Sequence, residues 1–172
     1  MNLKYFVAFT AVSLLGLGVA VANIENYGIA KADVIAQNNL CTDEDSCIIY
    51  NDNGIAIQGT DPVAYFREGK LVRGNSQFQH QWKGAIWHFS TSQNRDLFAG
   101  NPEKYAPQYG GYCAYAVSRG YVAPIDPAAW TIVDGKLYLN FSLEVRDLWA
   151  KDIPGNIAEA NKNWPLPELI NK

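Results

Sequence analysis

The chain has 172 residues and a formal net charge of −3, from 14 basic and 17 acidic side chains. This length is about that of one domain. A mildly acidic balance without a basic cluster argues against nucleic-acid binding. Five Trp, ten Tyr and seven Phe residues supply enough large apolar side chains for a dense core, so we expect a globular protein.

The first 22 residues have the pattern of a secretory signal peptide. Lys4 provides a basic start, an apolar run follows, and Ala20-Val21-Ala22 offers small residues for cleavage. The alternative is an uncleaved anchor, because the apolar run approaches the length that spans a bilayer. The pattern predicts a periplasmic or secreted protein, with membrane contact only if this segment is retained.

Residues 23–47 are predicted to be a flexible N-terminal segment, because polar and small residues dominate and hydrophobic periodicity is weak. Cys41 and Cys47 lie six positions apart in this segment. In an oxidising compartment we expect them to form a disulfide that closes a short polar loop, and the alternative is two free thiols. Residues 48–172 are then expected to form a single domain.

The domain begins with a turn at Asn51-Asp52-Asn53-Gly54 and a short strand over residues 55–59. Asp61-Pro62 interrupts this strand, and the Asp61 side chain is expected to accept hydrogen bonds from nearby backbone N–H groups. Alternating aromatic, apolar and polar residues then predict a hairpin with arms at 78–82 and 85–89.

The hydrophobic period next changes to that of a helix. Ser92 is expected to cap a helix that ends at Gly100-Asn101-Pro102, and a further turn carries Tyr105. Residues 112–117 fit a buried helix or a strand, and we favour a helix that begins just after Gly110-Gly111.

Residues 130–133 and 136–141 flank Asp134-Gly135, which is the signature of a tight hairpin. Ser142 is expected to cap an amphipathic helix, which Pro154-Gly155 interrupts before a last helix over 157–164. The complete pattern predicts an α+β fold: a small antiparallel sheet built from hairpins, with helices packed on one side.

Several blocks within residues 59–106 resemble the YHS domain family. These blocks are Asp61-Pro62-Val63, the strand at 84–89, the helix to Phe98, and Asn101-Pro102-Glu103-Lys104-Tyr105. More loosely, Tyr109-Gly110-Gly111-Tyr112-Cys113 and the stretch 130–135 resemble an exported bacterial subgroup of that family.

The resemblance implies soft-metal binding by cysteines in the best-described members. One of these cysteines follows the Asp-Pro-Val motif and two lie near the strand-to-helix junction, at positions that carry Ala64, Ser90 and Asn94 here. None of the three supplies the thiolate that copper(I) or zinc favours. We therefore expect that the metal site of the family does not carry over to this chain.

Cys113 is the main candidate for a functional residue. If a helix begins after Gly111, the thiol lies in its first turn, where backbone N–H groups favour a thiolate. Similar sequences of the subgroup can carry selenocysteine here, which implies redox or soft-metal chemistry. The alternative is a buried cysteine that packs as a small hydrophobe. No Cys-x-x-Cys motif is present, which argues against a dithiol oxidoreductase.

His80 and His88 are the two histidines, one on each arm of the first hairpin. Cys113 with His88, with or without His80, would be a minimal site for copper or zinc, or a thiol–imidazole pair. The alternative is that both histidines are ordinary polar residues of a sheet.

Two functional hypotheses follow from these residues. The first is an exported YHS-type protein that binds a soft metal ion or performs single-thiol redox chemistry at Cys113. The second is a non-catalytic module whose aromatic surface binds a small molecule or a protein, with Cys113 buried as packing. Nothing in the pattern decides whether the protein is an enzyme.

Overall fold

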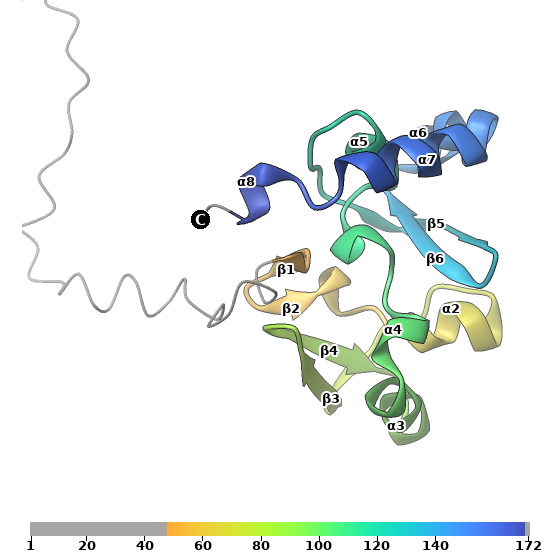
Figure 1. Cartoon of the computed structure of the whole chain (residues 1–172). Helices are drawn as coiled ribbons and strands as arrows, with labels where there is room; N and C mark the ends of the chain where they lie inside the picture. Colours follow the sequence, from red (N-terminus) through yellow and green to blue (C-terminus); the bar gives the residue numbers. More distant parts are fainter. Residues whose placement is uncertain (1–47, 171–172) are drawn as a thin grey trace, which may run out of the picture.

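The computed structural model describes residues 48–170 (Figure 1). The predicted signal peptide, the N-terminal segment and the Cys41–Cys47 disulfide lie outside the described residues. Within residues 48–170, no helix is both long and apolar enough to cross a membrane.

A four-stranded sheet forms the first half of the fold. Its strands are β1 (Asn51–Asp52), β2 (Ile55–Ala56), β3 (Asn75–Trp82) and β4 (Ala85–Phe89), in the spatial order β1-β2-β4-β3. β3 and β4 form the predicted antiparallel hairpin. β2, however, pairs with β4 in parallel, since the chain crosses over through a helix and β3 before it returns. The sheet is therefore mixed, which corrects the expectation of a purely antiparallel sheet.

A second sheet is the hairpin of β5 (Asp126–Val133) and β6 (Lys136–Asn140). Asp134 and Gly135 both have positive φ angles, 49° and 72°, as the tight turn predicted there requires. The expected α+β class is confirmed, with the strands divided between two sheets rather than joined in one.

Helices and short 3-10 segments cover and connect these sheets. The helices are α2 (Pro62–Glu68), α3 (Ser92–Gly100), α4 (Pro102–Tyr105), α5 (Ala114–Ser118), α6 (Leu143–Trp149), α7 (Ile153–Asn163) and α8 (Pro167–Ile170). In Figure 1, α3 and α4 lie beside the four-stranded sheet, whereas α5 and α6 pack against the β5–β6 hairpin and α7 packs against α5.

Two boundaries near the start of the domain differ from the sequence predictions. The strand expected over 55–59 stops after Ala56, because Ile57 and Gln58 take positive φ angles of 39° and 55° in a 3-10 turn. Thr91, rather than Ser92, caps α3, and its hydroxyl accepts the N–H of Asn94 at 3.1 Å.

Two later boundaries differ as well. α5 begins at Ala114, so Cys113 is its N-cap residue and not part of its first turn. Pro154 and Gly155 lie in the first turn of α7 instead of interrupting a helix. Proline is tolerated there because its missing N–H would have no partner in the helix. The Asp152 carboxylate accepts the Gly155 N–H at 3.0 Å and so starts this helix.

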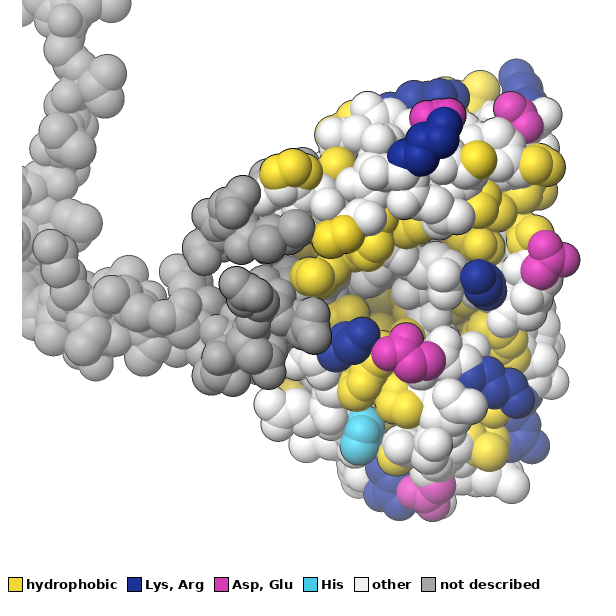
Figure 2. Space-filling model, viewed as in Figure 1, with side chains coloured by type: hydrophobic (Ala, Val, Ile, Leu, Met, Phe, Trp, Pro, Cys, Tyr) yellow, Lys and Arg dark blue, Asp and Glu magenta, His cyan; other side chains and the backbone are white. Residues whose placement is uncertain are grey.

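The β5–β6 hairpin joins two hydrophobic clusters. Leu137 and Leu139 of β6 pack in the first cluster with Trp87 of the four-stranded sheet. Tyr138 points to the opposite face and packs against Trp149 of α6 in the second cluster. The hairpin is therefore covered on both faces, by the first half of the domain and by helices. Figure 2 shows hydrophobic side chains along the hollowed boundary between these halves.

Candidate functional site

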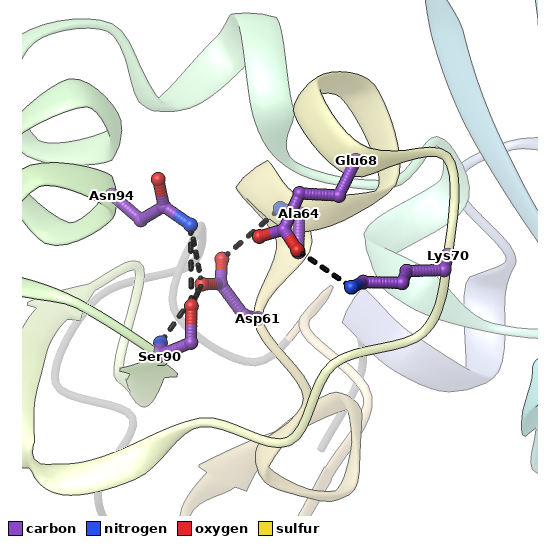
Figure 3. A network of polar contacts seen from close by, with 6 residues as sticks. All are labelled: Asp61, Ala64, Glu68, Lys70, Ser90 and Asn94. Atoms are coloured by element: carbon purple, nitrogen blue, oxygen red, sulfur yellow. Dashed lines mark hydrogen bonds and ion pairs between the residues drawn. The ribbon is translucent and has the colours of Figure 1, made fainter.

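The Asp61 carboxylate is fully buried and lies at the centre of a polar network (Figure 3). Its Oδ1 accepts the backbone N–H groups of Val63 at 2.9 Å and Ala64 at 3.3 Å. Its Oδ2 accepts the backbone N–H of Ser90 at 2.8 Å, the Ser90 hydroxyl at 2.7 Å and the Asn94 amide at 2.7 Å. The predicted bonding of Asp61 to nearby N–H groups is confirmed, and it starts α2.

The side chain of Cys113 is also buried, with only 1% exposed. Its sulfur accepts the backbone N–H of Phe141 at 3.3 Å, and its thiol donates to Oδ1 of Asn140 at 3.8 Å. The same Asn140 oxygen accepts the N–H of Tyr115 at 3.2 Å, which holds the amide in this orientation. The sulfur of Cys113 is therefore held between a backbone donor and a side-chain acceptor.

His80 and His88 lie on opposite faces of the four-stranded sheet. His80 is opposite Trp87 in the β3–β4 pairing, and its ring lies 6.1 Å from that of Phe98. The next residue along β4, His88, points to the other face and lines a shallow pocket with Arg73. Register thus separates two residues that the hairpin sequence placed close together.

The predicted metal ligands Cys113, His88 and His80 do not form a cluster. Among residues 48–170 there is no group of three or more His, Cys, Asp or Glu side chains that could hold a metal ion. The metal-binding roles of these three residues and the catalytic role of Cys113 therefore stay predictions.

A groove with a volume of about 370 Å³ lies between the two halves of the domain. Trp82 of β3, Tyr109 and Trp164 provide its aromatic lining, and Asn161 of α7 adds an amide. The Tyr109 ring lies 5.9 Å from that of Trp164, and its hydroxyl donates to Oδ1 of Asn161 at 3.0 Å. Burial raises the pKa of Tyr109, so its hydroxyl remains a donor at neutral pH.

Two opposite charges lie at the rim of the same groove. Lys83 and Glu103 form an ion pair at 3.2 Å, with 38% and 73% of their side chains exposed. The Lys83 ammonium group also lies 4.7 Å from the centre of the Trp82 ring. An exposed ion pair is weak and opens easily, so both charges are accessible to a ligand.

The turn Tyr109-Gly110-Gly111 shapes one wall of the groove. All three residues have positive φ angles, 57°, 60° and 86°. A Cβ atom at Gly110 would collide with the carbonyl oxygen of Ile48, and one at Gly111 would lie 2.9 Å from Cγ2 of Ile57. These glycines are therefore required by the backbone. The sequence indicated a sharp turn here, but the groove itself was not predicted, because its lining comes from separate parts of the chain.

Comparison with known proteins identifies one family. Residues 63–109 match the family model described as YHS domain, which covers most of α2 and all of β3, β4, α3 and α4. The chain therefore contains a YHS domain, as the resemblance predicted. No curated protein and no solved structure matches the chain.

The three positions at which this resemblance implies metal-binding cysteines lie together in the structure (Figure 3). Each donates to Asp61: Ala64 through its backbone N–H, Ser90 through its N–H and hydroxyl, and Asn94 through its side-chain amide. None carries a thiolate, and these donors are already paired with a carboxylate. The residues present therefore do not fit copper(I) or zinc.

Proposed function

We propose that this protein is a non-enzymatic binding module whose ligand site is the groove between the two halves, and that Cys113 is structural. The main support for this proposal is the environment of Cys113. Its sulfur is sealed from solvent and paired with Asn140 and Phe141. The open, aromatic-lined cavity lies elsewhere, where a ligand can reach it.

The chemistry of the groove indicates a small organic ligand. A volume of about 370 Å³ lies in the range of small-molecule sites, and the groove offers more polar than apolar surface beside its aromatic rings. Trp82 and Trp164 offer surfaces on which a flat or apolar group can pack. Lys83 is placed to bind a carboxylate once its ion pair with Glu103 opens. Small aromatic carboxylates are accordingly the probes of choice.

Ligand-observed NMR with indole-3-acetate and related aromatic carboxylates tests this proposal on the full chain. We expect binding that weakens about tenfold in Lys83→Gln, the loss of one charge-assisted contact. Arg73→Gln removes a cation from the pocket on the other face and is the matched control. No binding by any probe, or equal weakening in both variants, would contradict a groove site.

A second candidate function is single-thiol redox chemistry or soft-metal binding at Cys113. One observation favours it: the Phe141 N–H points at the sulfur, and such a bond stabilises negative charge there. The side-chain nitrogen of Asn140 is buried without a hydrogen-bond partner among the described residues. If the amide turned over, this nitrogen would donate to the sulfur, but the Tyr115 N–H would lose its acceptor.

Reaction of the native protein with a thiol reagent separates the two functions. A structural Cys113 reacts only after unfolding, whereas a functional thiol reacts under native conditions at neutral pH. Titration of the wild type and of Cys113→Ser with copper(I) or zinc then distinguishes metal binding at Cys113 from redox chemistry. Native reactivity of Cys113 would overturn its structural role.

The proposal includes export to the periplasm or the exterior, which rests on the pattern of residues 1–22. Intact-mass measurement of protein purified from the cell envelope tests it. A chain that has lost this segment supports export, and a full-length chain recovered from the soluble cytoplasm contradicts it.

A further inference from the structure

We infer that the ligand of the groove is a free aromatic amino acid, whose carboxylate pairs with Lys83 and whose ammonium group pairs with Glu103. The inference rests on the proposed groove site and narrows its ligand class. Among the groove-lining residues that the structure describes, Lys83 and Glu103 are the charged ones, so this lining carries no net charge. A pair of opposite charges is complementary to a ligand that brings both charges rather than one.

The two charges are brought together by different elements of the fold. Lys83 lies in the turn between β3 and β4, where its φ angle is 47°, and Glu103 lies in the first turn of α4. Their side chains place Nζ and Oε1 3.2 Å apart. In an amino acid, the carboxylate and the ammonium group are bonded to the same carbon atom. A small movement of the two exposed side chains therefore allows two ion pairs to form in place of one.

The aromatic part of the ligand has a surface next to these charges. The Lys83 ammonium group lies 4.7 Å from the centre of the Trp82 ring, so a carboxylate bound to Lys83 brings the rest of the ligand close to this ring. The Trp82 ring is itself held by Trp87 and Phe98, whose rings lie 5.8 Å and 5.7 Å away. Trp164 adds a second ring to the lining of the groove. Aromatic side chains pack on such rings, which favours aromatic over aliphatic amino acids.

A carboxylate without an ammonium group is expected to bind less tightly. It has to displace Glu103 from Lys83, and the displaced Glu103 carboxylate then stays close to the bound one and repels it. An amino acid avoids this repulsion because its ammonium group pairs with Glu103. Glu103 is 73% exposed, so water screens the contact and the preference is modest, about threefold. Glu103 thus determines specificity, whereas Lys83 supports the binding of both kinds of ligand.

Ligand-observed NMR on the full chain compares L-tryptophan with indole-3-propionate, which has the same skeleton without the ammonium group. We expect the wild type to bind L-tryptophan about threefold more tightly. In Glu103→Gln we expect this preference to disappear, mainly because indole-3-propionate binds about threefold more tightly than it binds the wild type. An unchanged preference in Glu103→Gln would overturn the inference.

Glu68→Gln is the matched control for this variant. Glu68 forms an ion pair with Lys70 at 3.1 Å, also between exposed side chains but outside the groove. Substitution of either exposed glutamate is expected to leave the fold intact. We expect Glu68→Gln to keep the wild-type preference for L-tryptophan. Equal losses of preference in the two variants would show that net charge, rather than contact with Glu103, causes it, and would overturn the inference.

N-acetyl-L-tryptophan distinguishes a free amino acid from the C-terminal residue of a protein, because it keeps the carboxylate but has no ammonium group. We expect it to bind no more tightly than indole-3-propionate. If it binds as tightly as L-tryptophan, a peptide end is the better ligand class and the inference falls.

Failure of this inference differs from failure of the groove site. If indole-3-propionate binds and weakens in Lys83→Gln, while L-tryptophan binds no more tightly, the groove site is supported and the inference alone is overturned. If none of the three probes binds, both are overturned.

Discussion

Cys113 and Asn140 form a buried pair in which the thiol donates to the amide oxygen at 3.8 Å, while that oxygen also receives the Tyr115 N–H at 3.2 Å. Cys113 is the N-cap residue of α5 and Asn140 is the last residue of β6. The pair therefore connects the start of α5 to the β5–β6 hairpin. This contact gives the Cys113 sulfur a structural role.

Asn140→Ala is expected to lower the free energy of unfolding by about 3 kcal/mol, since it leaves buried donors without an acceptor and opens a small cavity. Cys113→Ser keeps a donor and an acceptor at the same place, and we expect a loss of only about 1 kcal/mol. Urea unfolding measures both values. A larger loss in Cys113→Ser than in Asn140→Ala would contradict this order.

Gly110→Ala is expected to destabilise the domain more than the same substitution at Gly135. Both residues have positive φ angles, 60° and 72°, so each substitution carries about 1 kcal/mol of backbone strain. Only at Gly110 would the new Cβ also collide with the Ile48 carbonyl oxygen, whereas nothing lies within 4 Å at Gly135. Thermal unfolding of the two variants checks this prediction. Equal Tm values would show that a Cβ atom at residue 110 does not collide with the Ile48 carbonyl oxygen.

Tyr109→Phe is expected to weaken the domain by about 1 kcal/mol, the usual contribution of one hydrogen bond, here to Asn161. The ring remains in contact with Trp164, so the aromatic lining of the groove is kept. In the NMR assay, probe affinity should change less in this variant than in Lys83→Gln. A Tyr109→Phe variant with unchanged stability would show that the hydroxyl bond contributes little.

Stability is expected to fall in alkaline solution because burial raises the pKa of Tyr65 and Tyr109 above the ordinary value. In the unfolded chain these groups lose their protons near pH 10, whereas in the folded chain they keep them. Their contribution is thus complete below about pH 10 and is lost as pH rises further. Urea midpoints between pH 8 and 11 measure the slope. The slope of stability against pH should be shallower in the Tyr65→Phe and Tyr109→Phe double variant. An unchanged slope would show that neither tyrosine causes the loss of stability.

The state of Cys41 and Cys47 is tested by alkylation of the denatured, unreduced protein. If the predicted disulfide forms, Cys113 alone takes up a label, and reduction before alkylation gives three labels. Mass spectrometry counts them. Three labels without reduction would contradict the disulfide.

Local signals in the sequence were sufficient for several elements. Asp134-Gly135 between alternating runs predicted the β5–β6 hairpin, and Ser142 was correctly assigned as the cap of α6, where its hydroxyl accepts the Val145 N–H at 3.3 Å. A tight turn and a helix cap depend only on residues a few positions apart in the sequence. The start of α7 was misplaced because Pro154 fits the first turn of a helix as well as a break.

The sequence by itself determined the α+β class, the two hairpins, the YHS resemblance and the absence of thiolates at positions 64, 90 and 94. Only the tertiary structure decided that β2 pairs in parallel with β4, that His80 and His88 face opposite sides, and that Cys113 is buried beside Asn140. The reason is physical: register and burial depend on contacts between residues far apart along the chain, and neither periodicity nor composition encodes which segments meet.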